Sequence, residues 1–81
     1  MDVRYEFPSK DSNDCYIYHG PCKGMKIEDV IKMIAEFLDD VPSEFIMINY
    51  QNEGKHDPKD DQVQWLRDTS YKYFGDRALM T

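Results

Sequence analysis

Apolar and polar side chains alternate along residues 3–7, which is the pattern of a β-strand with one buried face. Pro8 is expected to end this strand, because its backbone nitrogen has no hydrogen to donate to a neighbouring strand. A second β-prone stretch, residues 15–18, runs into His19, Gly20 and Pro21, and Gly and Pro end strands sharply. We expect the two strands to form a hairpin across the polar loop of residues 9–14.

The clearest helical pattern in the chain starts at Ile27. Its apolar residues recur at three- and four-residue spacing: Ile27, Val30, Ile31, Ile34, Phe37 and Leu38. An acidic pair at positions 28–29 would stabilise the positive end of the helix dipole, whereas a second acidic pair at positions 39–40 would oppose its negative end. The helix is therefore expected to finish near the second pair, before Pro42. We expect its apolar stripe to form part of the core.

Residues 45–50 form a short and nearly unbroken apolar run directly after that helix. Such a run is typical of a parallel strand that is covered on both faces. A second helix is expected to begin at Asp57 and Pro58, which suit the N-cap and the first helical position, and to end at Gly75. The predicted order of elements is β-β-α-β-α, which makes the fold class α/β. Three aromatic residues are expected to pack in the core rather than stack on a ligand: Trp65, Tyr71 and Tyr73.

The composition bounds the kind of protein that this chain can form. With 81 residues, of which 41% are hydrophobic, the chain can bury one small core, and we expect a single unit over residues 1–81. The formal net charge of −6 and the lack of a cluster of Lys and Arg argue against binding to nucleic acid or to anionic lipid. We expect neither a signal peptide nor a membrane span, which needs roughly 20 apolar residues, and the compartment stays open.

Four residues of types that bind zinc occur in the chain: Cys15, His19, Cys22 and His56. If Cys15 and His19 lie four steps apart on one strand, their Cα atoms are about 13 Å apart, which is too far for both to hold one tetrahedral ion. We therefore expect no metal and no cofactor. We also expect Cys15 and Cys22 to be free thiols.

Three groups of polar residues stand where a catalytic site could form. Arg4 lies in the first predicted strand, His19 follows the second, and the third is followed by Gln51, Asn52 and Glu53. Because catalytic groups gather at the carboxyl ends of parallel strands, we expect these residues to lie near one another. An arginine supplies a permanent cation for a phosphate, and a histidine exchanges a proton near neutral pH. The combination suits cleavage of a phosphodiester.

The same residues carry a resemblance to a known family. Asp2-Val3-Arg4, then residues 17–21 with their His-Gly-Pro, then an amphipathic helix and finally residues 41–50 with their Pro-Ser-Glu follow one another over about fifty residues. In this order the chain resembles the middle of the X domain of phosphatidylinositol-specific phospholipase C. The resemblance implies a partial TIM-like barrel, with residues 1–81 forming a single partial X-type domain that acts on the head group of an inositol phospholipid.

The resemblance also implies roles for the matching residues. His19 would be the general acid that protonates the departing diacylglycerol oxygen. Arg4 would hold the phosphate and stabilise the charge on its oxygens in the transition state, and Asp2 would be an orienting carboxylate. Gln51 stands where bacterial members often carry a lysine, and we take it with Glu53 as a further contact to the substrate.

Departures from the family pattern bear on activity. A guanidinium at Arg4, where the metal-dependent branch has acidic calcium ligands, resembles the bacterial, calcium-independent branch. The family's first histidine, the general base, belongs to a strand upstream of Met1, and His56 follows the third strand and cannot easily replace it. Loss of one general base costs on the order of 10²–10⁴ in rate, so we expect this chain alone to be inactive. Barrel strands beyond Thr81 are also missing, which predicts open sheet edges and self-association.

A second interpretation assigns no catalysis to these residues. A histidine before Gly-Pro is commonly a turn residue. Arg4 and Asp2 could likewise be a solvated pair on an edge strand that contributes little to stability. The chain would then be a small acidic α/β interaction module, and the sequence leaves both interpretations open.

Overall fold

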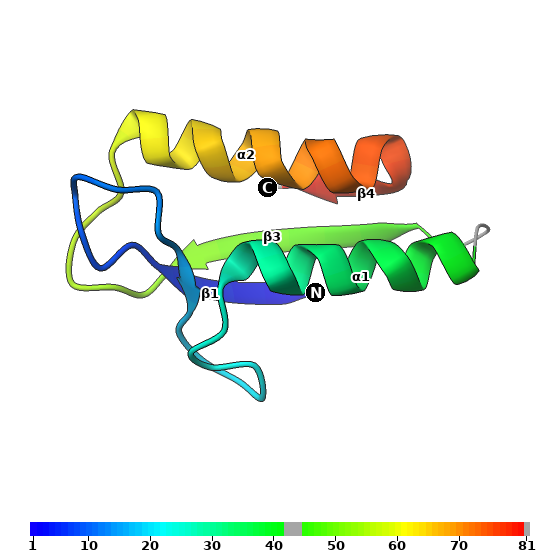
Figure 1. Ribbon diagram of the computed structural model, residues 1–81, viewed down its shortest axis with the longest axis horizontal. Coiled ribbons are helices and arrows are strands. Elements are labelled where there is room, and N and C mark those ends of the chain that lie inside the picture. The colour runs from blue at the N-terminus through cyan, green and yellow to red at the C-terminus, as the bar shows by residue number, and fades with distance from the viewer. Residues whose placement is uncertain (42–44, 81) are drawn as a thin grey trace.

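The computed structural model describes residues 1–41 and 45–80, and its elements are shown in Figure 1. In chain order they are β1 (Asp2–Glu6), β2 (Tyr16–Ile17), α1 (Ile27–Asp40), β3 (Ile46–Asn52), α2 (Asp60–Phe74), the 3-10 helix η1 (Gly75–Arg77) and β4 (Ala78–Met80). The α/β class and the order β-β-α-β-α are confirmed as far as α2. The second helix does not close the unit, because η1 and a fourth strand follow it.

The four strands form one mixed sheet in the order β2-β1-β3-β4. β1, β3 and β4 are parallel, while β2 pairs antiparallel with the end of β1, Tyr5 opposite Ile17 and Glu6 opposite Tyr16. The predicted hairpin is therefore confirmed. β4 pairs with the start of β3, where Ala78 lies opposite Ile46.

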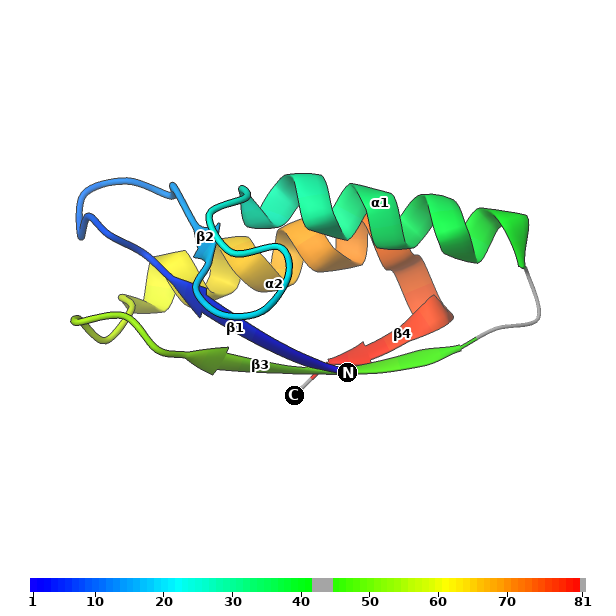
Figure 2. The ribbon, with the colours of Figure 1, turned by 90° about the horizontal axis from the view of Figure 1, so that it is seen from below.

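Both helices lie on the same face of the sheet (Figure 2). The chain steps from β1 to β3 and from β3 to β4 in one direction, and parallel crossovers are nearly always right-handed, so α1 and α2 fall on one side. The prediction that the third strand is covered on both faces is wrong. Ile48 is buried under the helices, whereas its neighbour Met47, which points to the opposite face, is 59% exposed.

The core lies between the helices and one face of the sheet. From α1 it takes Ile27, Ile31, Ala35 and Leu38, and from the sheet it takes Val3, Tyr5, Phe7, Ile17 and Ile48. Each large side chain buried in this way stabilises the fold by about 1.5–3 kcal/mol. Of the stripe predicted from Ile27 to Leu38, Ile27, Ile31 and Leu38 are buried in the core and Val30 and Ile34 are partly buried against it, whereas Phe37 is 58% exposed.

Aromatic contacts link the sheet to α2. The ring of Tyr5 meets the rings of Phe7 and Tyr50 edge-on, and Phe7 in turn meets Trp65 with ring centres 6.2 Å apart. Trp65 and Tyr73 pack against the core, as predicted. Tyr71 does not, because it lies on the outer side of α2 and is 66% exposed.

The helix ends follow local chemistry. α1 ends at Asp40, as expected, and the predicted stop at Pro42 lies outside the described residues. α2 begins at Asp60 rather than at Asp57 and Pro58, because the Lys59 backbone N–H donates to the Gln62 side chain over 2.9 Å and makes Lys59 the N-cap. Gly75 ends α2 as predicted, with the positive φ of +59° that favours glycine.

Candidate functional site

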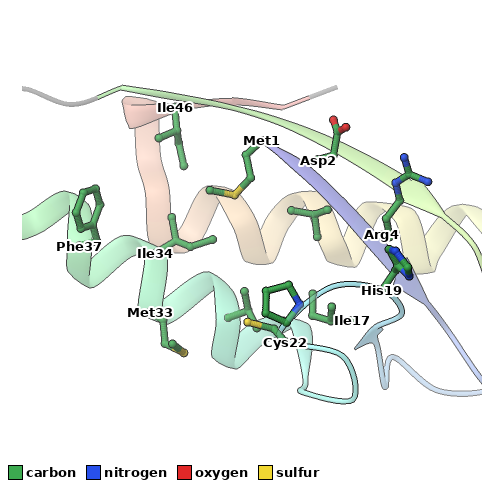
Figure 3. Close-up of a pocket in the computed structure, with 13 residues that line it drawn as sticks. Met1, Asp2, Arg4, Ile17, His19, Cys22, Met33, Ile34, Phe37 and Ile46 are labelled. Atoms are coloured by element: carbon green, nitrogen blue, oxygen red, sulfur yellow. The ribbon is translucent and has the colours of Figure 1, made fainter.

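One backbone hydrogen bond places His19 beside Arg4. The Tyr18 N–H donates to the Arg4 carbonyl oxygen over 2.8 Å, which continues the hairpin one pair beyond β2. Arg4 and His19 both line a groove of about 480 Å³ between α1 and the first residues of β1, which lie before its pairing with β2 (Figure 3). Both residues therefore line one groove, and His19 is exposed at its end, while the guanidinium of Arg4 pairs with Glu53.

We predicted that the three strand ends meet at one edge of the sheet, and this prediction is wrong. β2 runs antiparallel to β1, so the chain after Tyr18 returns toward the start of β1. Gln51 and Glu53 stand at the opposite, carboxyl end of the parallel strands. His19 therefore approaches Arg4 from the groove, whereas the residues after β3 approach it from the carboxyl end.

The remaining candidates gather on the face of the sheet that no helix covers. Val3 and Tyr5 point toward the helices, so Asp2 and Arg4, which alternate with them, point away, as Figure 3 shows for their charged ends. Arg4 lies beside Gln51 in the register of β1 with β3, and its guanidinium forms an ion pair with Glu53. The open face thus assembles Asp2, Arg4, Gln51 and Glu53.

The partners of Asp2 and Arg4 differ from one of our interpretations. Arg4 pairs with Glu53 and not with Asp2. Asp2 accepts a hydrogen bond of 3.4 Å from the side-chain amide of Asn49, its partner in register on β3. The backbone N–H of Glu53 donates to the Tyr5 carbonyl oxygen over 2.9 Å and fixes the place of the carboxylate.

The arrangement can bind an anion, although it already holds a carboxylate. A guanidinium has five N–H donors, and one carboxylate engages at most a pair of them in fork geometry. The side chains of Arg4 and Glu53 are 37% and 32% exposed, so a phosphate oxygen from solvent can reach the remaining donors. Glu53 then competes with any anionic ligand for Arg4.

A second, smaller cleft at the carboxyl end of β1 was not predicted from the sequence, although one of its residues, His56, was considered as a metal ligand and as a base. It measures about 300 Å³ and is lined by Glu6, Tyr18, Lys55 and His56, among others. Gly54 allows the loop after β3 to lie against β1 here, since a Cβ at Gly54 would stand 2.9 Å from the Cβ of Glu6. The signal that could have located this cleft is the position of Lys55 and His56 directly after a parallel strand.

The buried thiol and phenol near the sheet are not poised for chemistry at neutral pH. Burial, with a smaller effect from Glu6, raises the pKa of Cys15 to about 12. Burial also raises the pKa of Tyr50 to about 12, although its hydrogen bond of 2.7 Å with Ser70 acts in the other direction. Both groups stay protonated near pH 7 and belong to the core.

Cys15 and Cys22 are free thiols, as predicted. Within residues 1–41 and 45–80, no group of three or more His, Cys, Asp and Glu side chains is arranged to hold a metal ion. No helix of that part of the chain is long and apolar enough to cross a membrane.

Comparison with known proteins adds no relative. No family model matches the chain, and neither the curated proteins nor the solved structures contain a significant match to it. The candidate site is therefore defined by its own residues: Arg4 with Glu53, Gln51 and Asp2 on the open face of the sheet, and His19 beside them in the groove.

Proposed function

We propose that this chain is part of a phosphoric diester hydrolase that resembles the X domain of phosphatidylinositol-specific phospholipase C. The observation that carries the proposal is that Arg4 and His19 line one groove and lie next to each other across the hairpin, held by the bond from the Tyr18 N–H to the Arg4 carbonyl oxygen. A fixed cation beside an imidazole suits a substrate with a phosphate and a leaving oxygen. The head group of an inositol phospholipid is the substrate class that the resemblance favours.

The path of the chain supports a partial TIM-like barrel. β1, β3 and β4 follow one another in a single direction with both helices on one face, which is the arrangement of a β/α barrel, whereas doubly wound sheets carry helices on both faces. In a barrel the uncovered face with Asp2, Arg4 and Gln51 would point inward. The antiparallel β2 departs from a simple barrel repeat.

The proposed reaction is attack of the inositol 2-hydroxyl on phosphorus with departure of diacylglycerol. Arg4 binds the phosphate and stabilises the charge that develops on its oxygens. His19, protonated, gives its proton to the diacylglycerol oxygen as the P–O bond breaks. Asp2 orients, Gln51 and Glu53 contact the head group, and calcium is not required because the guanidinium supplies the positive charge.

The proposed acid has no matching base at the site. His56 lines the other cleft together with Lys55 and Glu6, whereas His19 lies in the groove. We therefore propose that these residues bind the head group but do not turn it over alone. The general base would come from another strand, as the resemblance implies.

Binding is the direct test, because it needs no base. The ¹⁵N-labelled chain would be titrated by NMR with inositol 1-phosphate in the presence of EDTA. We expect saturable shifts at the Arg4 side-chain N–H and at His19, and at least about tenfold weaker binding for Arg4→Gln. Arg67→Gln removes an exposed arginine of α2 and serves as the matched control. Equal binding by both variants would refute the proposed phosphate site.

A small acidic interaction module without catalysis is the alternative. The ion pair of Arg4 with Glu53 favours it, because a paired guanidinium is satisfied without a ligand. The same titration separates the two functions. A module of this kind would leave Arg4 and His19 unshifted by inositol 1-phosphate.

A further inference from the structure

Helix α1 carries more apolar surface than the sheet covers. Its buried stripe is followed around the helix by a second one, Val30, Met33, Ile34 and Phe37, with the i, i+3, i+4, i+7 spacing of a single helix face. Val30 and Ile34 are partly buried, while Met33 is 54% and Phe37 is 58% exposed. We call these four residues the second stripe.

The second stripe forms one wall of the groove that ends at His19. Figure 3 shows Met33, Ile34 and Phe37 along α1, with Met1 and Ile46 across the groove on the sheet. The opposite flank of α1 is covered by α2 and η1, where the Tyr73 hydroxyl of α2 donates to Glu28 over 2.8 Å and Arg77 of η1 pairs with Asp39. Among the described residues, none covers Met33 or Phe37 in this way.

The solvent edge of the second stripe is acidic. Asp29, Glu36 and Asp40 are exposed and stand at i, i+7 and i+11, which places them in one line next to Met33 and Phe37. None of the three forms an ion pair within the described part of the chain. Of the lysines on this helix, Lys32 lies beyond Glu36 and away from the stripe, and Lys26 precedes the first turn.

We propose that this groove binds a basic amphipathic helix that belongs to another polypeptide segment. The apolar face of that helix packs on the second stripe, and its Lys and Arg side chains lie along Asp29, Glu36 and Asp40. The 14 residues of α1 offer a wall of about 21 Å, enough for a partner helix of three to four turns. The acidic residues that rim the groove lie on α1, so the basic residues of the partner belong beside this helix.

The charges favour this occupant over two others. A second copy of the chain would bring the same acidic line and a net charge of −6 against itself. An anionic lipid surface would be repelled by the same carboxylates. The inference stands on the groove and its rim, and it is independent of the proposed phosphodiesterase activity.

The experiment uses the full chain, ¹⁵N-labelled, and a helical peptide of about 15 residues with leucines on one face and lysines on the other. We expect saturable NMR shifts along α1, at residues 1–4 and at His19, and weaker binding at high salt. A peptide with glutamates in place of the lysines, and one with the leucines scrambled around the helix, are expected to bind at least about tenfold more weakly.

Two variants locate the site. Phe37→Ser should weaken binding of the basic peptide about tenfold or more. Tyr71→Ser removes an equally exposed aromatic ring from the outer side of α2 and should leave binding unchanged. Because both rings are largely exposed, neither variant is expected to unfold the chain.

Several outcomes would overturn the proposal. Equal binding of the acidic peptide would remove the role of the carboxylates, and an equal loss in both serine variants would place the peptide elsewhere. If the same residues shift with protein concentration in the absence of peptide, and sedimentation shows a dimer, a second copy of the chain is the occupant. Shifts of those residues on addition of phosphatidylcholine vesicles, with none on addition of peptide, would assign the stripe to a lipid surface.

Discussion

Arg4 and Glu53 form an ion pair across the open face of the sheet, although 49 positions separate them in the chain. Arg4 is placed by β1, and Glu53 is held at the end of β3 by its own N–H bond to Tyr5. The carboxylate therefore stands where an anionic ligand of Arg4 has to bind. This pair determines how readily the proposed phosphate site can be filled.

Removing the charge of Glu53 is expected to strengthen phosphate binding. In Glu53→Gln the guanidinium loses a competitor, and because exposed ion pairs contribute up to about 1 kcal/mol, affinity for inositol 1-phosphate should rise up to about fivefold. Asp11→Asn changes the net charge equally at an exposed ion pair with Lys59, in which Arg4 takes no part, and is the control. Isothermal titration calorimetry measures both, and equal gains would mean that only the net charge matters.

The proposed acid role of His19 can be tested in any longer polypeptide that contains this chain and supplies a base. With phosphatidylinositol as substrate and EDTA present, His19→Ala is expected to abolish release of cyclic inositol phosphate, because it removes the proposed donor of the proton to the leaving oxygen. His56→Ala, in the second cleft, should keep the activity. Unchanged release by His19→Ala would show that another group is the acid.

The elements predicted correctly are those whose cause is local. The periodicity of α1, the hairpin of β1 and β2, and the stop at Gly75 all depend on neighbours within a few positions. β4 was missed because three residues carry no periodic signal, and their strand geometry comes from pairing with the start of β3, more than thirty positions earlier. The composition of β3 could not show that the helices cover only one face of the sheet, because this depends on the path of the chain.

The site was predictable to a similar extent. The pairing of Arg4 with His19 in one pocket follows from a hairpin that the sequence indicates. The partner of Arg4 does not, because Glu53 reaches it only through the register of two strands that are distant in sequence. The exposure of Phe37 was not predictable either. Periodicity alone assigns every apolar residue of α1 to the core, but the apolar face of this helix is wider than the sheet can cover.

Gln62 is expected to be the polar residue on which the fold depends most. It is 2% exposed, and its amide nitrogen donates to the carbonyl oxygens of Ser9 and Ser12 over 2.9 and 2.8 Å, which ties the first loop to α2. Gln62→Ala leaves these acceptors without their donor and should lower the free energy of unfolding by about 2–4 kcal/mol. Gln64→Ala, an exposed neighbour that bonds only to Asp68 in the described chain, should change it by less than about 0.5 kcal/mol. Urea denaturation compares the two.

Stability is expected to fall at alkaline pH because buried acids, of which Cys15 and Tyr50 have the largest pKa shifts, release their protons later in the folded than in the unfolded chain. Burial raises the pKa of Cys15 from its usual 9.0 to about 12 and that of Tyr50 from 10.0 to about 12. Between these values the unfolded chain has released protons that the folded chain retains, so rising pH favours unfolding. The stabilising effect is fully present below about pH 9 and is lost as pH approaches 12, with a slope of up to about 1.4 kcal/mol per pH unit for each group.

Urea denaturation at steps from pH 8 to pH 11 measures this loss. Cys15→Ala removes the earlier of the two titrations, so its free energy of unfolding should decline only above about pH 10, where the unfolded phenols begin to ionise. Cys22→Ala, at the partly buried second thiol, is the matched control and should follow the parent chain. A Cys15→Ala chain that loses stability from pH 9 as steeply as the parent would show that the buried thiol is not the group responsible.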